Sequence, residues 1–184
     1  MEGLDLLGER KEVTIMETDI RGFTSISEKM EPEEVVTLIN KYLDKQTEVI
    51  KSHNGDIDKF IGDAVLAVFE GKNMADNAVS CAINIQLEIN KLNQDFGGDT
   101  MVGIGINTGP VVMGPVGSKD RMDYTVIGDN VNLAARLCDK AGPGEIVISE
   151  NTKKYLTQDK FNLKTQAPVQ LKGKEKSVIN YLVV

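Results

Sequence analysis

Features that would place this chain in a membrane or outside the cell are missing from its sequence. No apolar run approaches the length of a membrane-spanning helix. The first residues, MEGLDLLGER, lack the apolar core of a secretory signal. The only two cysteines, Cys81 and Cys138, fall in helical apolar patterns, as reduced core cysteines do. These absences favour a cytoplasmic protein, or the cytoplasmic part of a larger membrane-attached one.

A basic character is missing as well. The formal net charge is −7, which argues against a nucleic-acid partner, because such partners require a basic face. The charge is compatible with a nucleotide, since a few local lysines and metal ions can hold a triphosphate. The only histidine, His53, precedes Asn54 and Gly55 in a predicted turn, and we assign it no catalytic role.

The composition that remains, 41% apolar and 27% charged, is typical of one globular domain over residues 1–184. We predict the α+β class: a ferredoxin-like βαββαβ core with additional C-terminal strands and a helix, and with helices packed on one face of an antiparallel sheet. The predicted elements are a strand at 13–20, a helix at 33–50, a hairpin at 56–70, a helix at 73–92 capped by Asn73, a second hairpin from 101–109 and 111–117, a helix at 129–140, a strand at 145–149, a short helix at 150–156 and strands at 161–171 and 178–183.

Two aspartates end neighbouring predicted strands. Asp19 closes the first strand, and Asp63 lies in the turn of the hairpin. Alone, each is explained by hydrogen bonds to its local backbone. If the first strand lies beside the hairpin, the two carboxylates converge at one end of the sheet, and such a site suits two Mg²⁺ or Mn²⁺ ions.

The residues after Asp19 turn from strand to helix. Backbone N–H groups of this turn, I-R-G-F-T (20–24), are candidates to receive phosphate oxygens, and we include Phe23 and Thr24 among the substrate-binding candidates. A lone glycine at such a turn is weak evidence by itself.

Polar residues also recur on the helix at 129–140. Asn132 and Arg136 are four residues apart and therefore share a face, where an arginine can neutralise charge on a phosphate and an asparagine can orient a ribose. A solvated polar face explains the same spacing. The basic segment LKGKEK (171–176) is open to the same two interpretations: a solvated surface, or a lysine that reaches terminal phosphates.

Four motifs together resemble class III adenylyl and guanylyl cyclase catalytic domains. They are D-I-R-G-F-T (19–24), K-F-I-G-D (59–63), R-M-D-Y-T-V-I-G-D-N-V-N-L-A-A-R (121–136) and L-K-G-K (171–174), in the order and spacing of that family. The resemblance covers roughly residues 10–184. Each motif alone is weak, whereas four in sequence are specific.

The resemblance implies roles for individual residues. Asp19 and Asp63, with the Ile20 carbonyl, resemble the ligands of two divalent cations, Mg²⁺ or Mn²⁺. Lys59 and Thr125 fall where the family reads the purine, and Lys59 favours ATP because a lysine cannot accept the N1–H of guanine.

Further residues match the part of the family pattern that binds ribose and phosphates. Asn132 and Arg136 resemble the ribose-orienting and transition-state residues, Lys172 the lysine that grips terminal phosphates, and Arg121 a further phosphate candidate. The implied reaction converts ATP to cyclic AMP and pyrophosphate by in-line attack of the ribose 3′-hydroxyl at two metal ions. The implied assembly is a head-to-tail homodimer with shared sites.

Two positions depart from the family pattern. Glu17 stands where relatives carry a large apolar residue, and strand alternation places it on the side of Asp19. A third carboxylate there can raise the pKa of Asp19 or disturb the metal site, although we favour a Glu17 that pairs with a base or faces solvent. Asn130 replaces a common threonine, and we expect little consequence.

Three alternatives stay open. A guanylyl cyclase is opposed by Lys59 and Thr125. A catalytically silent nucleotide-binding or dimerisation module has only Glu17 in its support. A diguanylate cyclase is disfavoured because Gly97-Gly98-Asp99 is followed by Thr100 in place of a second acidic residue. The chain begins almost at the first predicted strand, so we expect a fragment of a larger protein with a regulatory or sensor domain.

Overall fold

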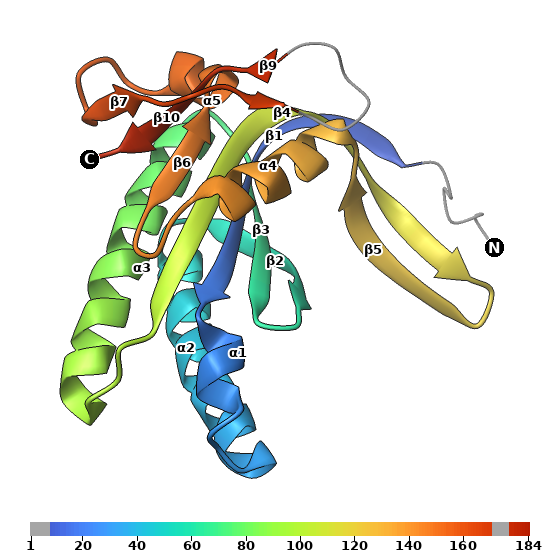
Figure 1. Cartoon of the computed structure of the whole chain (residues 1–184). Helices are drawn as coiled ribbons and strands as arrows, with labels where there is room; N and C mark the ends of the chain where they lie inside the picture. The colour runs from blue at the N-terminus through green and yellow to red at the C-terminus, as the bar shows by residue number, and fades with distance from the viewer. Residues whose placement is uncertain (1–7, 171–176) are drawn as a thin grey trace.

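The computed structural model describes residues 8–170 and 177–184. Strands and helices alternate along the chain and are labelled in Figure 1. In chain order they are β1 Glu9–Arg21, α1 Phe23–Ser27, α2 Pro32–Ser52, β2 Gly55–Ile61, β3 Ala64–Phe69, α3 Met74–Phe96, β4 Met101–Ser118, β5 Arg121–Ile127, α4 Asp129–Lys140, β6 Ile146–Ser149, α5 Glu150–Tyr155, β7 Leu163–Thr165, β8 Val169–Gln170, β9 Ser177–Val178 and β10 Asn180–Val183.

The main sheet has the strand order β2-β3-β1-β4-β6-β10-β7, with β5 paired to β4. Its first four strands and the helices between them have the order of a ferredoxin-like βαββαβ core, and β6, β10 and β7 extend it at the C-terminal side. All pairs in the sheet are antiparallel except β4 with β6. The predicted α+β class is therefore confirmed.

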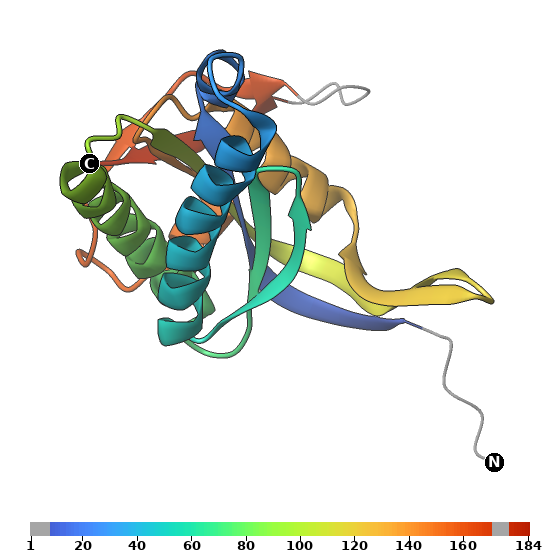
Figure 2. The same ribbon diagram turned by 90° about the horizontal axis from the view of Figure 1, so that it is seen from below.

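Helices cover both faces of the sheet, so the expectation of a single covered face is wrong. Successive residues of β1 point to opposite faces: Met16 belongs to the core under α2 and α3, whereas Ile15 packs in a second cluster with Ala134 of α4. Figure 2 shows α2 and α3 together on one side of the sheet and α4 apart from them. The strands between these layers carry buried apolar residues on both faces. Their sequences therefore lack the alternation of apolar and polar residues that would indicate a single covered face.

A hairpin turn at Gly109 and Pro110 was also expected and is absent, because 101–118 form one strand, β4. β1 pairs along β4 from Met101 to Met113 and holds it extended. On its other side β4 pairs with β6 at 104–106 and with β5 at 112–118, so Pro110 lies between these segments. Its missing N–H therefore removes no ladder bond on that side.

Asp76, in the first turn of α3, ties this helix to the segment after α5. Its carboxylate accepts hydrogen bonds from the Thr157 backbone N–H at 2.9 Å and from the Thr157 hydroxyl at 2.5 Å, and it lies 3.4 Å from Lys160 Nζ. Burial raises the pKa of Asp76, but these hydrogen bonds and the lysine charge outweigh it and leave the pKa below its usual value. Asn73 is the N-cap residue of α3, as predicted, but its side chain makes no capping hydrogen bond.

We expect Asp76→Ala to lower the free energy of unfolding by about 2 kcal/mol at neutral pH, since it removes two hydrogen bonds that Thr157 donates to a buried carboxylate. Because the folded pKa lies below the unfolded one, the Asp76 contribution is complete above the unfolded value of about 3.9 and is lost as the pH falls through the folded value. Urea unfolding at several pH values measures this difference between variant and unmutated chain. A difference that does not shrink in acid contradicts the assignment; Lys160→Met, at the exposed partner, is the milder control.

Candidate active site

Asp19 and Asp63 meet at one end of the sheet. In the antiparallel pair of β1 with β3, Asp19 lies opposite Ala64, the first residue of β3. Asp63 precedes Ala64 in the β2–β3 turn, where Gly62 takes a φ of 61° that favours glycine. Both carboxylates line one open cleft of about 520 Å³. The convergence predicted from the two strand ends is present.

This cleft suits a divalent cation. Burial is the largest cause that raises the pKa of Asp19, and repulsion by the negative charge of Asp63 is the next. A cation bound between the two carboxylates would offset this repulsion. Ile20 lines the same cleft, as do Phe23 and Thr24 of α1. Within residues 8–170 and 177–184, no group of three or more His, Cys, Asp or Glu is placed to hold a metal. Two carboxylates and the Ile20 carbonyl are therefore the candidate protein ligands, with the remaining positions left for water or a nucleotide.

Arg21 connects this cleft to α4. Its Nη1 donates to Asp19 Oδ2 at 3.0 Å, and its other nitrogens donate to the carbonyls of Cys138 and Ala141 at the C-terminal end of α4. A cation at a helix C-terminus is favourable because the last carbonyls carry partial negative charge. Arg21 therefore holds Asp19 and the end of α4 in one hydrogen-bonded unit.

Glu17 is half-buried, and the charges that act on it are those of Asp139, Asp19 and Arg21. Burial, then the charges of Asp139 and Asp19, raise the pKa of Glu17 to about 7, against the opposing effect of Arg21. Among the residues that the structure describes, Glu17 forms no salt bridge. The preference for a paired or solvent-facing Glu17 is therefore wrong.

We predict that Glu17→Phe leaves cyclic nucleotide formation unchanged or raises it a few-fold, because it removes a carboxylate from beside Asp19 and supplies apolar bulk to a half-buried position. The measurement is the initial rate of the variant and of the unmutated chain over a series of Mn²⁺ concentrations. Glu17→Gln, which removes the charge at constant size, separates the two effects. A large loss in both variants assigns Glu17 a positive role.

Lys59 and Thr125 come together from strands that are distant in sequence. Lys59 is on β2 and Thr125 on β5, and the Lys59 Nζ donates to Thr125 Oγ1 at 2.5 Å. Thr125 is buried, whereas Lys59 is partly exposed and lies at the edge of the sheet. The two residues expected to read a purine are thus in direct contact.

Asp58 completes this group, and the sequence analysis missed it. Its Oδ2 accepts the Thr125 hydroxyl at 3.1 Å and lies 3.5 Å from Lys59 Nζ. Regular alternation places Asp58 and Lys59 on opposite faces of a strand. A register shift between Ile57 and Lys59 breaks the alternation, and no signal in the sequence marks it.

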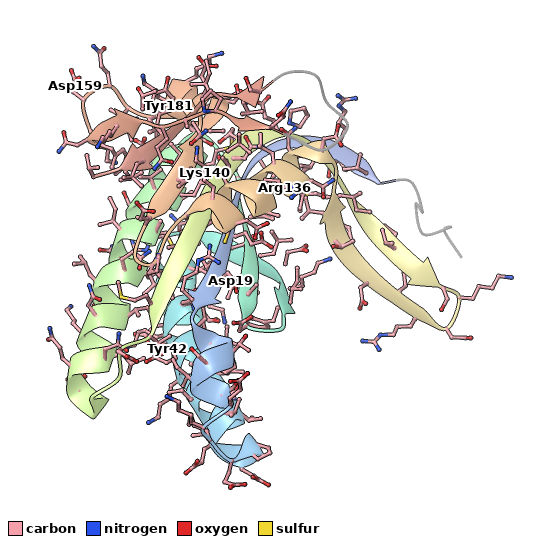
Figure 3. All side chains as sticks on the ribbon, viewed as in Figure 1. Asp19, Tyr42, Arg136, Lys140, Asp159 and Tyr181 are labelled. Carbon is pink, nitrogen blue, oxygen red and sulfur yellow. The ribbon has the colours of Figure 1, made fainter. Side chains whose placement is uncertain are left out.

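Asn132 and Arg136 lie on α4, where Asn132 is exposed and Arg136 is half-buried. Arg136 is labelled on this helix in Figure 3. Asn130 fixes the start of this helix: its Nδ2 donates to the Pro110 carbonyl at 2.8 Å, and Asn107 Nδ2 donates to its Oδ1 at 3.0 Å. Asn130, expected to have little consequence, therefore connects β4 to α4 through hydrogen bonds.

One further predicted residue, Arg121, is not brought to the cleft. Arg121 is highly exposed at the turn of the β4–β5 hairpin, which projects from the body of the molecule (Figure 1). Lys172 lies outside the described residues. Of the described candidates, Lys59, Thr125, Asn132, Arg136 and Arg121 do not line the cleft of Asp19 and Asp63. One chain therefore does not bring all of the candidate residues to the cleft of the two aspartates.

Known cyclases share this fold. A crystal structure of the adenylyl cyclase CyaB from P. aeruginosa aligns with a TM-score of 0.90 at 36% identity, covering 96% of this chain and 95% of that one. A crystal structure of the guanylyl cyclase Cya2 aligns equally well, with a TM-score of 0.90 at 39% identity, covering 96% and 93%. The fold and site thus define a nucleotidyl cyclase domain.

The family model described as the adenylate and guanylate cyclase catalytic domain matches residues 7–184, and the chain belongs to this family. An adenylate cyclase of Anabaena cylindrica is 40% identical over 94% of this chain, and one of Dictyostelium discoideum, specific to terminal differentiation, is 38% identical over 95%. The chain spans only 37% and 9% of these two proteins. In the part of the chain that the structure describes, no helix has the length and apolar character needed to cross a bilayer.

Proposed function

We propose that this domain is an adenylyl cyclase, which converts ATP to 3′,5′-cyclic AMP and pyrophosphate. The observation that carries the proposal is the contact between Lys59 Nζ and Thr125 Oγ1. An ammonium group donates to the ring nitrogen N1 of adenine, and a hydroxyl oxygen accepts from its 6-amino group. Guanine presents an N1–H and a 6-oxo group at these positions, so the ammonium group meets a donor and loses its acceptor.

The proposed active form is a head-to-tail homodimer, since the purine pair, Asn132 and Arg136 do not line the cleft of Asp19 and Asp63 within one chain. In this assembly one subunit supplies Asp19 and Asp63, and the other supplies the purine pair with Asn132 and Arg136. Exposed apolar side chains support an interface between copies. They lie on β2 and on both faces of the β4–β5 hairpin, each at least 45% exposed: Phe60, Ile61, Val112, Val116, Met122, Tyr124 and Ile127.

The side chains divide the reaction between them. Asp19, Asp63 and the Ile20 carbonyl would hold two divalent cations, Mg²⁺ or Mn²⁺, which when bound acidify the ribose 3′-hydroxyl and offset charge on the leaving pyrophosphate. Asn132 orients the ribose for in-line attack on the α-phosphorus. Arg136 neutralises the charge that develops on the phosphate oxygens. Phe23 and Thr24 border the triphosphate, and Arg121 and Lys172 are candidate phosphate contacts.

The test is product formation from ATP and from GTP, with Mn²⁺ and with Mg²⁺, over a range of protein concentrations. The proposal expects cyclic AMP from ATP, a preference over GTP, and a specific activity that rises as the protein is concentrated. A specific activity that does not change across the dissociation range of the dimer contradicts the shared site. No cyclic nucleotide from either substrate, at concentrations where the chain is dimeric, overturns the enzyme assignment in favour of a silent nucleotide-binding module.

A guanylyl cyclase is the second candidate, because the overall structure matches the guanylyl cyclase Cya2 as well as it matches an adenylyl cyclase. Predominant formation of cyclic GMP from GTP in the same assay selects it. Attachment of this domain to a regulatory or sensor domain is a further proposal, supported by the small part of each relative that the chain spans.

A further inference from the structure

A β-bulge in β2 brings a buried carboxylate to the purine pair. Asp58 lies where the pairing of β2 with β3 shifts between Ile57 and Lys59. In a bulge two residues oppose one on the partner strand, so neighbouring side chains can point to the same side. Asp58 and Lys59 both reach Thr125 in this way. The Asp58 side chain is only 7% exposed, against 42% for Lys59.

These contacts fix the direction of the Thr125 hydroxyl. A threonine hydroxyl has one proton to donate and two lone pairs with which to accept. The ammonium of Lys59 can only donate, so it occupies one lone pair at 2.5 Å. The carboxylate of Asp58 can only accept, so it takes the proton at 3.1 Å. Any further group that approaches Thr125 Oγ1 therefore meets a lone pair.

We infer that Asp58 is a positioning residue for purine selection: it commits Thr125 to accept and so makes it select a 6-amino purine over a 6-oxo purine. The inference rests on the proposed function, in which Lys59 and Thr125 contact the base. A 6-amino group donates to the remaining lone pair of Thr125. A 6-oxo group brings a second acceptor to it, and the hydroxyl cannot turn its proton outward while Asp58 holds it.

The experiment compares the unmutated chain with Asp58→Ala, with Thr125→Val and with the double variant. Two ratios are measured for each: kcat/KM for ATP over GTP, and the affinity for 3′-deoxyATP over 3′-deoxyGTP, which lack the attacking hydroxyl. We expect Asp58→Ala to lower both ratios about tenfold, because the freed hydroxyl can donate to a 6-oxo group. In the Thr125→Val background the same change has no effect on either ratio, since there is no hydroxyl to orient.

The controls separate selection from folding. Asp56→Ala removes an exposed carboxylate from the same strand and leaves both ratios unchanged. A loss of fold lowers turnover of ATP and GTP together and does not move the ratio. Preference for ATP that survives Asp58→Ala, or that falls equally in the Thr125→Val background, overturns the inference.

The binding ratio also distinguishes this inference from the proposed function. If the unmutated chain forms no cyclic nucleotide, the enzyme assignment fails, and the affinities for the two 3′-deoxynucleotides still decide the role of Asp58. Equal affinity of the unmutated chain for both deoxynucleotides overturns the purine assignment and the inference together.

Discussion

Chains carrying Asp63→Asn and chains carrying Arg136→Ala are each expected to be inactive, with losses of about a thousandfold, and to regain activity when mixed. In a head-to-tail dimer, one of the two sites in a mixed pair combines the intact Asp63 of one chain with the intact Arg136 of the other. Half of the dimers in an equal mixture are mixed, and each has one working site of two. The mixture should therefore recover about a quarter of the unmutated specific activity.

The measurement is cyclic AMP formation by each variant alone and by the equal mixture after time for subunit exchange. A mixture of Asp63→Asn with Asp19→Asn is the matched control, because both changes damage the same half of a site and no mixed pair contains an intact one. Recovery in the control, or none in the Asp63 and Arg136 mixture, contradicts the division of residues between subunits.

The largest effect on the fold is expected at Gly105 in the middle of β4. A Cβ at this position lies 2.2 Å from the Cys138 backbone nitrogen and 2.5 Å from the Ala134 carbonyl oxygen, and both atoms belong to the backbone of α4. Backbone cannot rotate away as the end of a side chain can, so α4 must move as a body. We predict that Gly105→Ala lowers the free energy of unfolding by about 3 kcal/mol or more.

Denaturant unfolding measures this loss, and activity provides a second readout because α4 carries Asn132 and Arg136. If the folded fraction is restored by low temperature, catalysis should stay impaired, since α4 is displaced. Val36→Ala, at an exposed position on α2, is the control and should change stability by less than about 0.5 kcal/mol. If Gly105→Ala has the stability of the unmutated chain, β4 and α4 can move apart at little cost in free energy, and the prediction is wrong.

Of the candidate site, the sequence alone predicts the residues at strand ends and turns. Asp19 and Asp63 sit at a strand end and at a Gly-Asp turn, so local patterns place them, and antiparallel pairing then brings them together. Lys59 and Thr125 are brought into contact by tertiary packing, and only the family resemblance linked them. Asp58 escaped notice because a bulge depends on how two strands pair, which single-strand alternation does not record.

The fold shows the same limit. The class and the core topology followed from the order of strands and helices, which apolar periodicity reveals. The turn expected at Gly109 and Pro110 failed because pairing with β1 continues to Met113 and overrides the local turn signal. The placement of α4 depends on Gly105, whose missing side chain is a packing requirement that no periodic pattern expresses.

Arg21 has a consequence for the way variants of this domain are interpreted. One guanidinium group neutralises Asp19 and at the same time binds the last carbonyls of the helix that carries Arg136. In the proposed dimer, Asp19 of a chain serves one catalytic centre, while Arg136 of the same chain serves the other. The two catalytic centres are then coupled through the Arg21 side chain. A change in the position of Asp19 in one centre can therefore shift α4, and with it Arg136, in the other. Kinetic defects of an Arg21 variant would therefore belong to the pair of centres and not to either alone.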